Sequence, residues 1–144
     1  ARFIELADEI NTNMPRYVVT KVGEALNEDS KPVRGSKVLI LGVAYKANVD
    51  DVRESPALDI IQLLQQQGAV VIYHDPHVPD LEFDDVKMCA VKYDLREFSN
   101  ADCVLILTHH SSYDWVEILE NAHLVIDTRN ATADLQGRAR VVKL

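Results

Sequence analysis

The feature that most constrains the fold is an apolar run that leads into a polar loop and then into a capped helix. Residues 38–41 are all apolar, and Gly42 follows them directly. An unbroken run of this kind predicts a parallel strand that is covered on both faces. After the loop, Ser55 predicts an N-cap, Pro56 the first helical residue, and Gly68 the helix end. A strand, a loop and a helix in this order predict an open α/β sheet with a crevice at the crossing.

Short apolar runs alternate with helical patterns along the rest of the chain. We expect further strands at residues 69–73, 87–91, 103–107, 124–126 and 139–142. Strands that are separated by helices favour parallel pairing, because the chain must cross back over the sheet between them. The sequence therefore predicts a Rossmann-like, doubly wound α/β fold, in which helices cover both faces of a mostly parallel sheet.

Two short helices and one loop complete this expectation. Asp94 with Glu97, and Ser111 with Asp114, have the spacing at which polar side chains cap the first turn of a helix. The segment 74–86 contains two prolines and several acids, and we expect it to be a loop. The predicted sheet therefore receives its third strand only after this loop.

The first 27 residues have apolar side chains at helical spacing. The sequence Met14–Pro15 interrupts this pattern, so we expect either two helices or one broken helix, with Asn13 available to cap the second piece. Residues 28–36 are polar and contain proline and glycine, which is typical of a linker. Because the chain starts inside an amphipathic helix, we expect it to be a piece of a longer protein.

Charge and cysteine content limit the classes of function. The formal net charge is -8 and the sequence pI is near 5.0, which argues against nucleic acid or an anionic membrane as the main partner. No apolar run approaches the length of a membrane span, so the cytoplasm is the expected location. Cys89 and Cys103 lack a Cys-x-x-Cys spacing, and we expect both to be buried as small hydrophobic residues.

Two cations flank the predicted strand-to-helix crossing. Lys46 lies soon after the strand, and Arg53 lies just before the helix N-cap, where helix N-termini favour phosphate. The G-x-G-x-x-G pattern that cradles a pyrophosphate is missing, because Gly42 stands alone. Side-chain cations must therefore do more of the phosphate binding. We expect Asp50 and Asp51 to shape the loop and orient the arginine.

The residues around this crossing resemble a known family. Residues 41–57 contain Leu-Gly-(small)-Ala-(aromatic)-Lys and Asp-Asp-(apolar)-Arg-(acid)-Ser-Pro-Ala, and the likeness continues at 68–69, 75–76 and 126–129. This pattern resembles the C-terminal, UDP-binding domain of the UDP-glucose/GDP-mannose dehydrogenase family. The resemblance implies that residues 1–30 are the end of an interdomain helix with its linker. Residues 31–144 would then be the UDP-binding domain.

The resemblance also implies an activity for the full-length protein. It would oxidise the C6 alcohol of a UDP-sugar to a carboxylate, with NAD held mainly by an upstream domain and with a catalytic cysteine that lies upstream. This chain alone would then be inactive, and the full-length enzyme would be a homodimer in polysaccharide precursor synthesis. The segments 11–17 and 74–79 resemble UDP-N-acetylglucosamine and UDP-N-acetylmannosamine 6-dehydrogenases more than UDP-glucose enzymes.

Four site residues follow from the resemblance. It assigns Tyr45, Lys46 and Arg129 to the UDP-sugar substrate, and Arg53 to the NAD side, where a planar guanidinium can hold two phosphate oxygens. Arg129 also follows a predicted strand, so it should lie on the same sheet edge as Lys46. The alternative role for Lys46 or Arg53 is that of an ordinary surface charge.

Other interpretations stay open. The set His74, Asp75, His77, His109 and His110 has the residue types of a metal site, but its spacing matches no metal motif, and we favour loop residues instead. Asp75 is also a candidate for hydrogen bonding ribose hydroxyls. A different class of function is a stand-alone flavodoxin-like nucleotide-binding or signalling module, and a third is an assembly domain that binds no nucleotide.

Overall fold

The fold is a five-stranded parallel sheet between two layers of helices, preceded by one long helix. The computed structural model describes residues 2–144, and it describes the side chains from residue 13 onward. The elements in chain order are α1 (Arg2–Glu28), β1 (Lys37–Leu41), α2 (Pro56–Gln66), β2 (Val70–His74), β3 (Asp80–Phe83), β4 (Val86–Cys89), α3 (Leu95–Asn100), β5 (Cys103–Ile106), α4 (Trp115–Asn121), β6 (Leu124–Asp127) and β7 (Arg140–Lys143).

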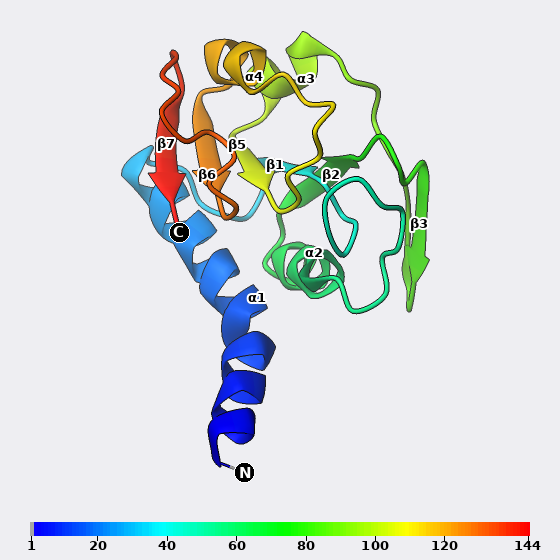
Figure 1. The fold of residues 1–144 in the computed structure, drawn as a ribbon. Helices are drawn as coiled ribbons and strands as arrows, with labels where there is room; N and C mark the ends of the chain where they lie inside the picture. The colour runs from blue at the N-terminus through cyan, green and yellow to red at the C-terminus, as the bar shows by residue number, and fades with distance from the viewer. Residues whose placement is uncertain (1) are drawn as a thin grey trace.

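The strand order places a topological switch at the centre of the sheet. The order is β2-β1-β5-β6-β7, and every neighbouring pair in this sheet is parallel (Figure 1). From β1 the chain first moves outward to β2 and later returns to the other side of β1 as β5. The chain therefore leaves the carboxyl ends of β1 and β5 toward helices on opposite faces of the sheet, and such a point is where open α/β sheets bind ligands.

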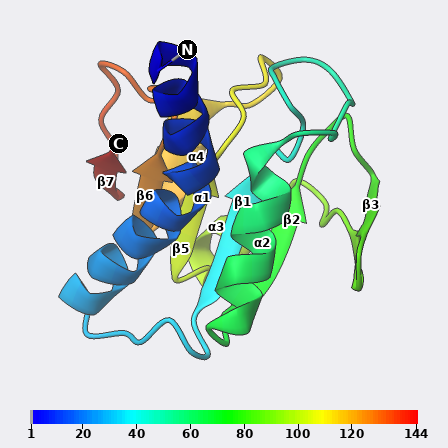
Figure 2. The ribbon, with the colours of Figure 1, turned by 90° about the horizontal axis from the view of Figure 1, so that it is seen from below.

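Helices cover both faces of the sheet, as the sequence predicted. Helices α1 and α2 lie side by side on one face, and α3 and α4 lie on the other (Figure 2). Strand β1 contributes to both cores: Val38 and Ile40 face α1 and α2, whereas Leu39 and Leu41 face the opposite core. Burial on both faces explains why this strand is an unbroken apolar run. The predicted Rossmann-like α/β fold is confirmed.

Helix α2 begins as its sequence predicts. Ser55 accepts a hydrogen bond from the Ala57 N–H at 3.2 Å, and Pro56 occupies the first turn. Gly68, with φ of 89°, follows the helix end and allows the chain to turn into β2. The loop that carries Arg53 is therefore attached to a rigid helix start.

Helix α1 corrects the expectation of a break at Met14–Pro15. It runs without interruption from Arg2 to Glu28, so Asn13 lies inside the helix and does not cap it. A proline inside a helix removes one hydrogen bond and crowds the preceding turn. Here Pro15 is buried, and the apolar face formed by residues 18–26 packs into the core beside α2. Packing along the whole face therefore outweighs the local preference of the proline.

The end of α1 is fastened to the last strand of the sheet. The Arg140 guanidinium on β7 donates to Ala25 O, to Glu28 Oε2 and to Asp29 Oδ1, each at 3.0 Å. Val142 on the same strand packs against the core that α1 helps to form. The α1 helix and the α/β body thus share one core, and the division into residues 1–30 and 31–144 stays a prediction.

A separate β-hairpin begins in the second half of the predicted loop at 74–86, whereas residues 75–79 are a loop as predicted. Strands β3 and β4 pair antiparallel with each other and not with the main sheet, so the third predicted strand was placed wrongly. The alternation of Asp80 and Glu82 with Leu81 and Phe83 is the period-two signal of a half-buried strand. The acids in this segment had masked that signal.

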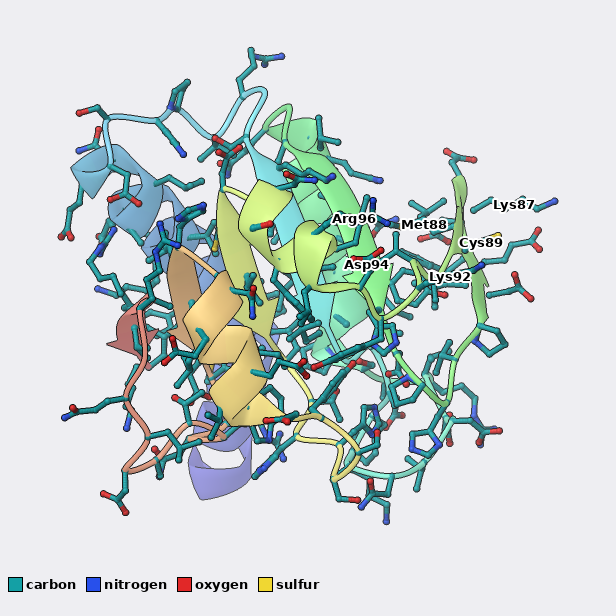
Figure 3. The ribbon with its side chains drawn as sticks, turned by 90° about the horizontal axis from the view of Figure 1, so that it is seen from above. Lys87, Met88, Cys89, Lys92, Asp94 and Arg96 are labelled. Carbon is teal, nitrogen blue, oxygen red and sulfur yellow. The ribbon has the colours of Figure 1, made fainter. Side chains whose placement is uncertain are left out.

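Cys89 lies on the outer side of this hairpin, where the sequence predicted a buried residue. Lys87 and Cys89 point outward, whereas Met88 between them points toward the body (Figure 3). The Cys89 Sγ–H donates to Asp80 Oδ1 at 3.3 Å across the strand pair. Cys103, by contrast, is buried in β5 as expected. The alternation of inward and outward side chains along β4 therefore explains why Cys89 is exposed.

The two short helices keep their predicted N-caps but not the predicted partners. Asp94 accepts from the Arg96 N–H at 2.9 Å and also pairs with the Arg96 guanidinium, beside which it lies in Figure 3. Asp114 accepts from the Glu117 N–H, whereas Ser111 donates to Asn48 Oδ1.

Within the described part of the chain, no helix combines the length and apolarity that a bilayer crossing requires.

Candidate functional site

The switch point is built around a close approach of the loops that follow β1 and β5. Gly42 has φ of 87°, and a Cβ added to it would lie 2.4 Å from the Cβ of Thr108. Only glycine fits, because both the backbone conformation and the contact exclude a side chain. Thr108 Oγ1 also donates to Ala44 O at 2.9 Å. The first residues of the β1 loop are therefore fixed against the β5 loop.

A buried carboxylate fixes the same loop from the β2 side. Asp75 is 3% exposed, and its Oδ2 accepts hydrogen bonds from the N–H groups of Val43 at 2.8 Å and Ala44 at 3.2 Å. Its Oδ1 accepts from the His77 N–H at 2.8 Å. Both oxygens are thus used inside the protein. This burial contradicts the hypothesis that Asp75 binds ribose hydroxyls, and its role is structural.

His110 completes the anchoring of the loop. Its Nε2 lies 2.9 Å from Asp75 Oδ2, and its Nδ1 lies 2.8 Å from the backbone nitrogen of Asn48. A backbone N–H can only donate, so Nδ1 accepts and the ring proton sits on Nε2, which donates to Asp75. Asn48 Oδ1 in turn accepts from the N–H and the hydroxyl of Ser111. His110 is fully buried.

Tyr45 and Lys46 lie on the exposed tip of this anchored loop. Ala44, just before them, donates its N–H to Asp75, and Asn48, two residues after them, donates its N–H to His110. The Tyr45 N–H donates to Asp51 O at 2.6 Å. Tyr45 is 52% exposed, and Lys46 is exposed as well. Among the described side chains, no carboxylate pairs with Lys46. Its charge is therefore available to an anion.

Arg53 is held by its neighbour Asp51. The Arg53 side chain donates from Nε to Oδ1 at 3.1 Å and from Nη2 to Oδ2 at 3.0 Å, and its backbone N–H also donates to Oδ1. These hydrogen bonds hold the pKa of the Asp51 carboxyl below its usual value. The predicted orienting role of Asp51 is confirmed. Tyr45, Arg53 and Glu54 line one hollow together with Asp51, so the structure brings Tyr45 and Arg53 together.

A second buried carboxylate organises the loop that carries Arg129. Asp127 accepts four hydrogen bonds: Oδ1 from the N–H groups of Arg129 and Ala131, and Oδ2 from the N–H and the hydroxyl of Thr132. Burial acts to raise the pKa of Asp127, but these hydrogen bonds together hold it below its ordinary value. The charged carboxylate therefore fixes the backbone of Arg129.

Lys46 and Arg129 lie on the same edge of the sheet. Strands β1, β5 and β6 are parallel neighbours, so the loops after β1 and β6 leave the same edge with β5 between them. Arg129 is exposed and, within the described side chains, forms no ion pair. Their common edge was predicted from sequence and is confirmed. A shared grip on a diphosphate stays a prediction.

The histidines near this edge have separate partners. His74 Nδ1 hydrogen bonds with the Tyr113 hydroxyl, His77 packs its ring on that of His110 with centroids 4.7 Å apart, and His109 packs edge-on against Trp115. Within the described residues, no three His, Cys, Asp or Glu side chains converge as metal ligands. The metal-site alternative therefore finds no support in this part of the chain.

The positioning residues Asn48, Thr108, His110 and Asp127 were missed as parts of the site. Thr108, His110 and Asp127 lie at or within four residues of the carboxyl end of a strand, which is the signal that could have found them. From sequence, the only candidate role for His110 is that of a metal ligand. The contacts of Asn48, Thr108 and His110 join separate loops and leave no local spacing in the sequence, whereas those of Asp127 stay within its own loop.

Together, the strand order and the anchored cationic loops define a Rossmann-like α/β domain with its ligand edge at the switch point. Residues 39–134 match the model of the UDP binding domain of the UDP-glucose/GDP-mannose dehydrogenase family. The chain belongs to this family. The resemblance seen in the sequence is confirmed, and a stand-alone signalling module is not favoured.

Similar proteins include several N-acetyl sugar dehydrogenases. The chain is 36% identical over 141 residues to the UDP-N-acetyl-D-mannosamine dehydrogenase of Methanococcus maripaludis, covering 90% of this chain and 30% of that protein. It is 30% identical over 138 residues to the UDP-glucose 6-dehydrogenase of Rickettsia bellii, covering 90% of this chain and 31% of that protein. The chain thus spans about a third of the length of these relatives.

Two solved structures have the same fold over almost the whole chain. The UDP-D-ManNAc dehydrogenase of Pyrococcus horikoshii superimposes with a TM-score of 0.80 at 26% identity, over 97% of this chain and 32% of that one. The UDP-N-acetyl-mannosamine dehydrogenase of Staphylococcus aureus gives a TM-score of 0.77 at 33% identity, over 99% and 33%. The long helix α1 is therefore part of the shared fold.

Proposed function

We propose that this chain is the UDP-binding part of an NAD-dependent UDP-sugar 6-dehydrogenase. The full-length protein would oxidise the C6 alcohol of the sugar to a carboxylate, and two NAD molecules would accept the electrons as hydride. The observation that carries the proposal is a family match over residues 39–134, which includes the anchored loop that presents Lys46. A loop fixed before the ligand arrives loses little entropy on binding.

Lys46 and Arg129 bind the diphosphate in this proposal. Both cations are exposed, neither is ion-paired within the described side chains, and both follow strands that end at one sheet edge. Lysine supplies a point charge, and the arginine fork can hold two phosphate oxygens. Tyr45, beside Lys46, packs against the bound substrate.

Arg53 contacts NAD in this proposal. Its guanidinium side chain is 87% exposed, and Asp51 binds only part of its donor fork, which leaves N–H groups for a phosphate of the cofactor. The residue is thus able to reach a group held by an upstream domain. Tyr45 lines the same hollow, so the substrate and cofactor sides meet there.

The contribution of this chain to the reaction is positioning. By holding the nucleotide end, it would direct the sugar C6 toward a thiol and a nicotinamide that upstream parts supply. The two thiols of this chain do not suit nucleophilic attack. Burial raises the pKa of Cys103, and the hydrogen bond to Asp80 raises the pKa of Cys89, so both stay protonated near neutral pH. The chain alone would therefore reduce no NAD.

We assign the sugar to the UDP-N-acetylhexosamines in preference to UDP-glucose. The segment 74–79 and the N-terminal segment 11–17 resemble enzymes for these sugars, and several relatives carry the name UDP-N-acetyl-D-mannosamine dehydrogenase. The full-length protein would act in the cytoplasm as a homodimer and supply sugar acids for polysaccharide synthesis. Initial rates of the full-length enzyme on UDP-glucose, UDP-N-acetylglucosamine and UDP-N-acetylmannosamine test the assignment.

Lys46→Ala tests the central step. We expect UDP binding by the 144-residue chain, measured by calorimetry, to weaken by roughly tenfold or more, because one charge-assisted contact to phosphate is lost. Lys87→Ala is the matched control, since Lys87 is an exposed lysine on the β3-β4 hairpin. Equal affinities for the Lys46→Ala chain and the unmodified chain would remove the basis of the proposal.

A further inference from the structure

The most completely buried ionisable pair of the described residues lies under the Lys46 loop. The side chains of Asp75 and His110 are both 0% exposed, and Asp75 Oδ2 and His110 Nε2 are 2.9 Å apart. Burying two such groups is costly unless their hydrogen bonds are satisfied. Here their partners are three backbone N–H groups of the Lys46 loop, those of Val43, Ala44 and Asn48, together with the His77 N–H.

We propose that His110, acting with Asp75, is a positioning residue that holds the Lys46 loop in its UDP-binding conformation only while the imidazole is neutral. The identity of the ligand in this inference rests on the proposed function. Asp75 holds the start of the loop, and His110 holds its end at Asn48. Lys46 lies between these two anchors, so the position of its ammonium group depends on both.

The chemistry of the imidazole makes the second anchor sensitive to protonation. In the neutral ring, Nε2–H donates to Asp75 and Nδ1 accepts from the Asn48 N–H. A second proton on Nδ1 would place two N–H groups against each other at 2.8 Å, where no hydrogen bond is possible. The Asn48 backbone must then move away. The bond from Asp75 to the start of the loop does not change.

Asn48 carries the effect to a neighbouring loop. The backbone of Asn48 has φ of 62°, in the left-handed region, and the Asn48 Oδ1 accepts from the N–H and the hydroxyl of Ser111. This conformation is held by its contacts, because a side chain disfavours it. Loss of the His110 contact therefore releases the end of the loop that carries Lys46 and loosens the Ser111 contact as well.

Other titratable groups face His110. Asp75 and His77 come from the loop after β2, and the ring centroids of His77 and His110 are 4.7 Å apart. Tyr113 comes from the segment before α4, and its ring centroid lies 6.0 Å from that of His110. His77 also carries an imidazole. A pH profile of UDP affinity for the unmodified chain therefore reports on the imidazoles of both His77 and His110. Only a variant of His110 separates the two.

His110→Gln is the decisive variant. A glutamine amide can donate to Asp75 and accept from the Asn48 N–H at every pH, because it does not titrate. UDP affinity of the 144-residue chain is measured by calorimetry at about pH 8 and about pH 5.5. We expect the unmodified chain to lose roughly tenfold more affinity between these values than His110→Gln does. His109→Gln is the control: His109 is exposed, contacts Trp115, and should follow the unmodified chain.

A second measurement does not need the ligand. The hydrogen-exchange protection of the Asn48 amide, corrected for the intrinsic rate, should fall at acid pH in the unmodified chain and in His109→Gln, but not in His110→Gln. Imidazole nitrogen resonances should show the Nε2–H tautomer of His110 near pH 8. Equal pH profiles for His110→Gln and the unmodified chain, in both affinity and amide protection, would overturn the inference.

The two measurements also separate this inference from the proposed function. If the chain binds no UDP at any pH while the Asn48 protection behaves as expected, the proposed function is wrong and the proton-sensitive anchor stands. If Lys46→Ala weakens UDP binding but His110→Gln leaves the pH profile unchanged, the function stands and the inference is wrong. Thermal unfolding of each variant confirms that the compared chains are folded.

Discussion

Two buried carboxylates hold two loops at the same sheet edge, and they do so with different partners. Asp127 holds the Arg129 loop through N–H and hydroxyl donors alone. Asp75 holds the Lys46 loop through N–H donors and through the imidazole of His110. The Asp127 carboxylate thus has no imidazole among its hydrogen-bond partners, whereas the Asp75 carboxylate has one. The edge therefore combines a fixed cation with a cation whose support depends on a proton.

The difference shows how two cations at one site can be positioned by loops that respond differently to pH. Peptide N–H groups and a threonine hydroxyl keep their protons across the neutral range, so the Asp127 loop stays organised until the carboxylate itself is protonated. Imidazole changes its charge between about pH 5 and pH 8 when unperturbed. The response of ligand binding to acid should therefore arise on the β1 and β5 side of the edge.

Asp127→Ala should have the largest effect on this comparison. The change leaves three backbone N–H groups and the Thr132 hydroxyl without an acceptor inside the fold, so we expect a loss of about 4 kcal/mol in the free energy of unfolding. Urea denaturation near pH 7 measures it. Glu120→Ala, at an exposed position of α4, is the control.

The pH dependence of that loss has a definite sign. The pKa of Asp127 is depressed in the folded chain, so its stabilising contribution is complete above the unfolded value of about 3.9 and disappears as the pH falls through the folded value. The difference between Asp127→Ala and the unmodified chain should therefore shrink only in strong acid. A difference that vanished already near pH 6 would show that the Asp127 loop is proton-sensitive too.

Gly42→Ala should have the next largest effect. Its new Cβ would meet Thr108 Cβ at 2.4 Å with φ of 87°, so we expect a loss of about 3 kcal/mol in stability. Gly35→Ala is a matched control, because Gly35 has φ of 84° and nothing within 4 Å of an added Cβ. That control should lose only about 1 kcal/mol, the cost of the left-handed backbone. Similar losses for both would mean that the β1 and β5 loops are not tightly joined.

Asp51→Asn should have the smallest effect on stability. Asp51 organises Arg53 as the buried carboxylates organise their loops, but the Arg53 side chain is 87% exposed and the pair is screened by water and salt. We expect no measurable shift of the urea midpoint. In the full-length enzyme the KM for NAD should rise, because the guanidinium loses its orientation. A large loss of stability instead would place Asp51 with the buried anchors.

The sequence predicted what depends on neighbours along the chain. The apolar run of β1, the Ser55 cap of α2 and the sheet edge of Lys46 all follow from local patterns. The continuity of α1 through Pro15 depends on packing against α2, which no local pattern contains. The anchoring of the Lys46 loop joins residues 48, 75 and 110, which lie on three loops. Such contacts appear only when the fold brings the loops together.

The hydrogen bonds of Arg140 join the long helix to the outermost strand of the sheet. The guanidinium grips the final turn of α1 at Ala25, Glu28 and Asp29 from the outermost strand β7. The last turn of α1 is thus joined to the edge strand β7, whereas Met14 and Pro15 further along the same helix line a hollow with Tyr45 and Glu54. Helix α1 therefore links the outermost strand of the sheet to the residues around Tyr45.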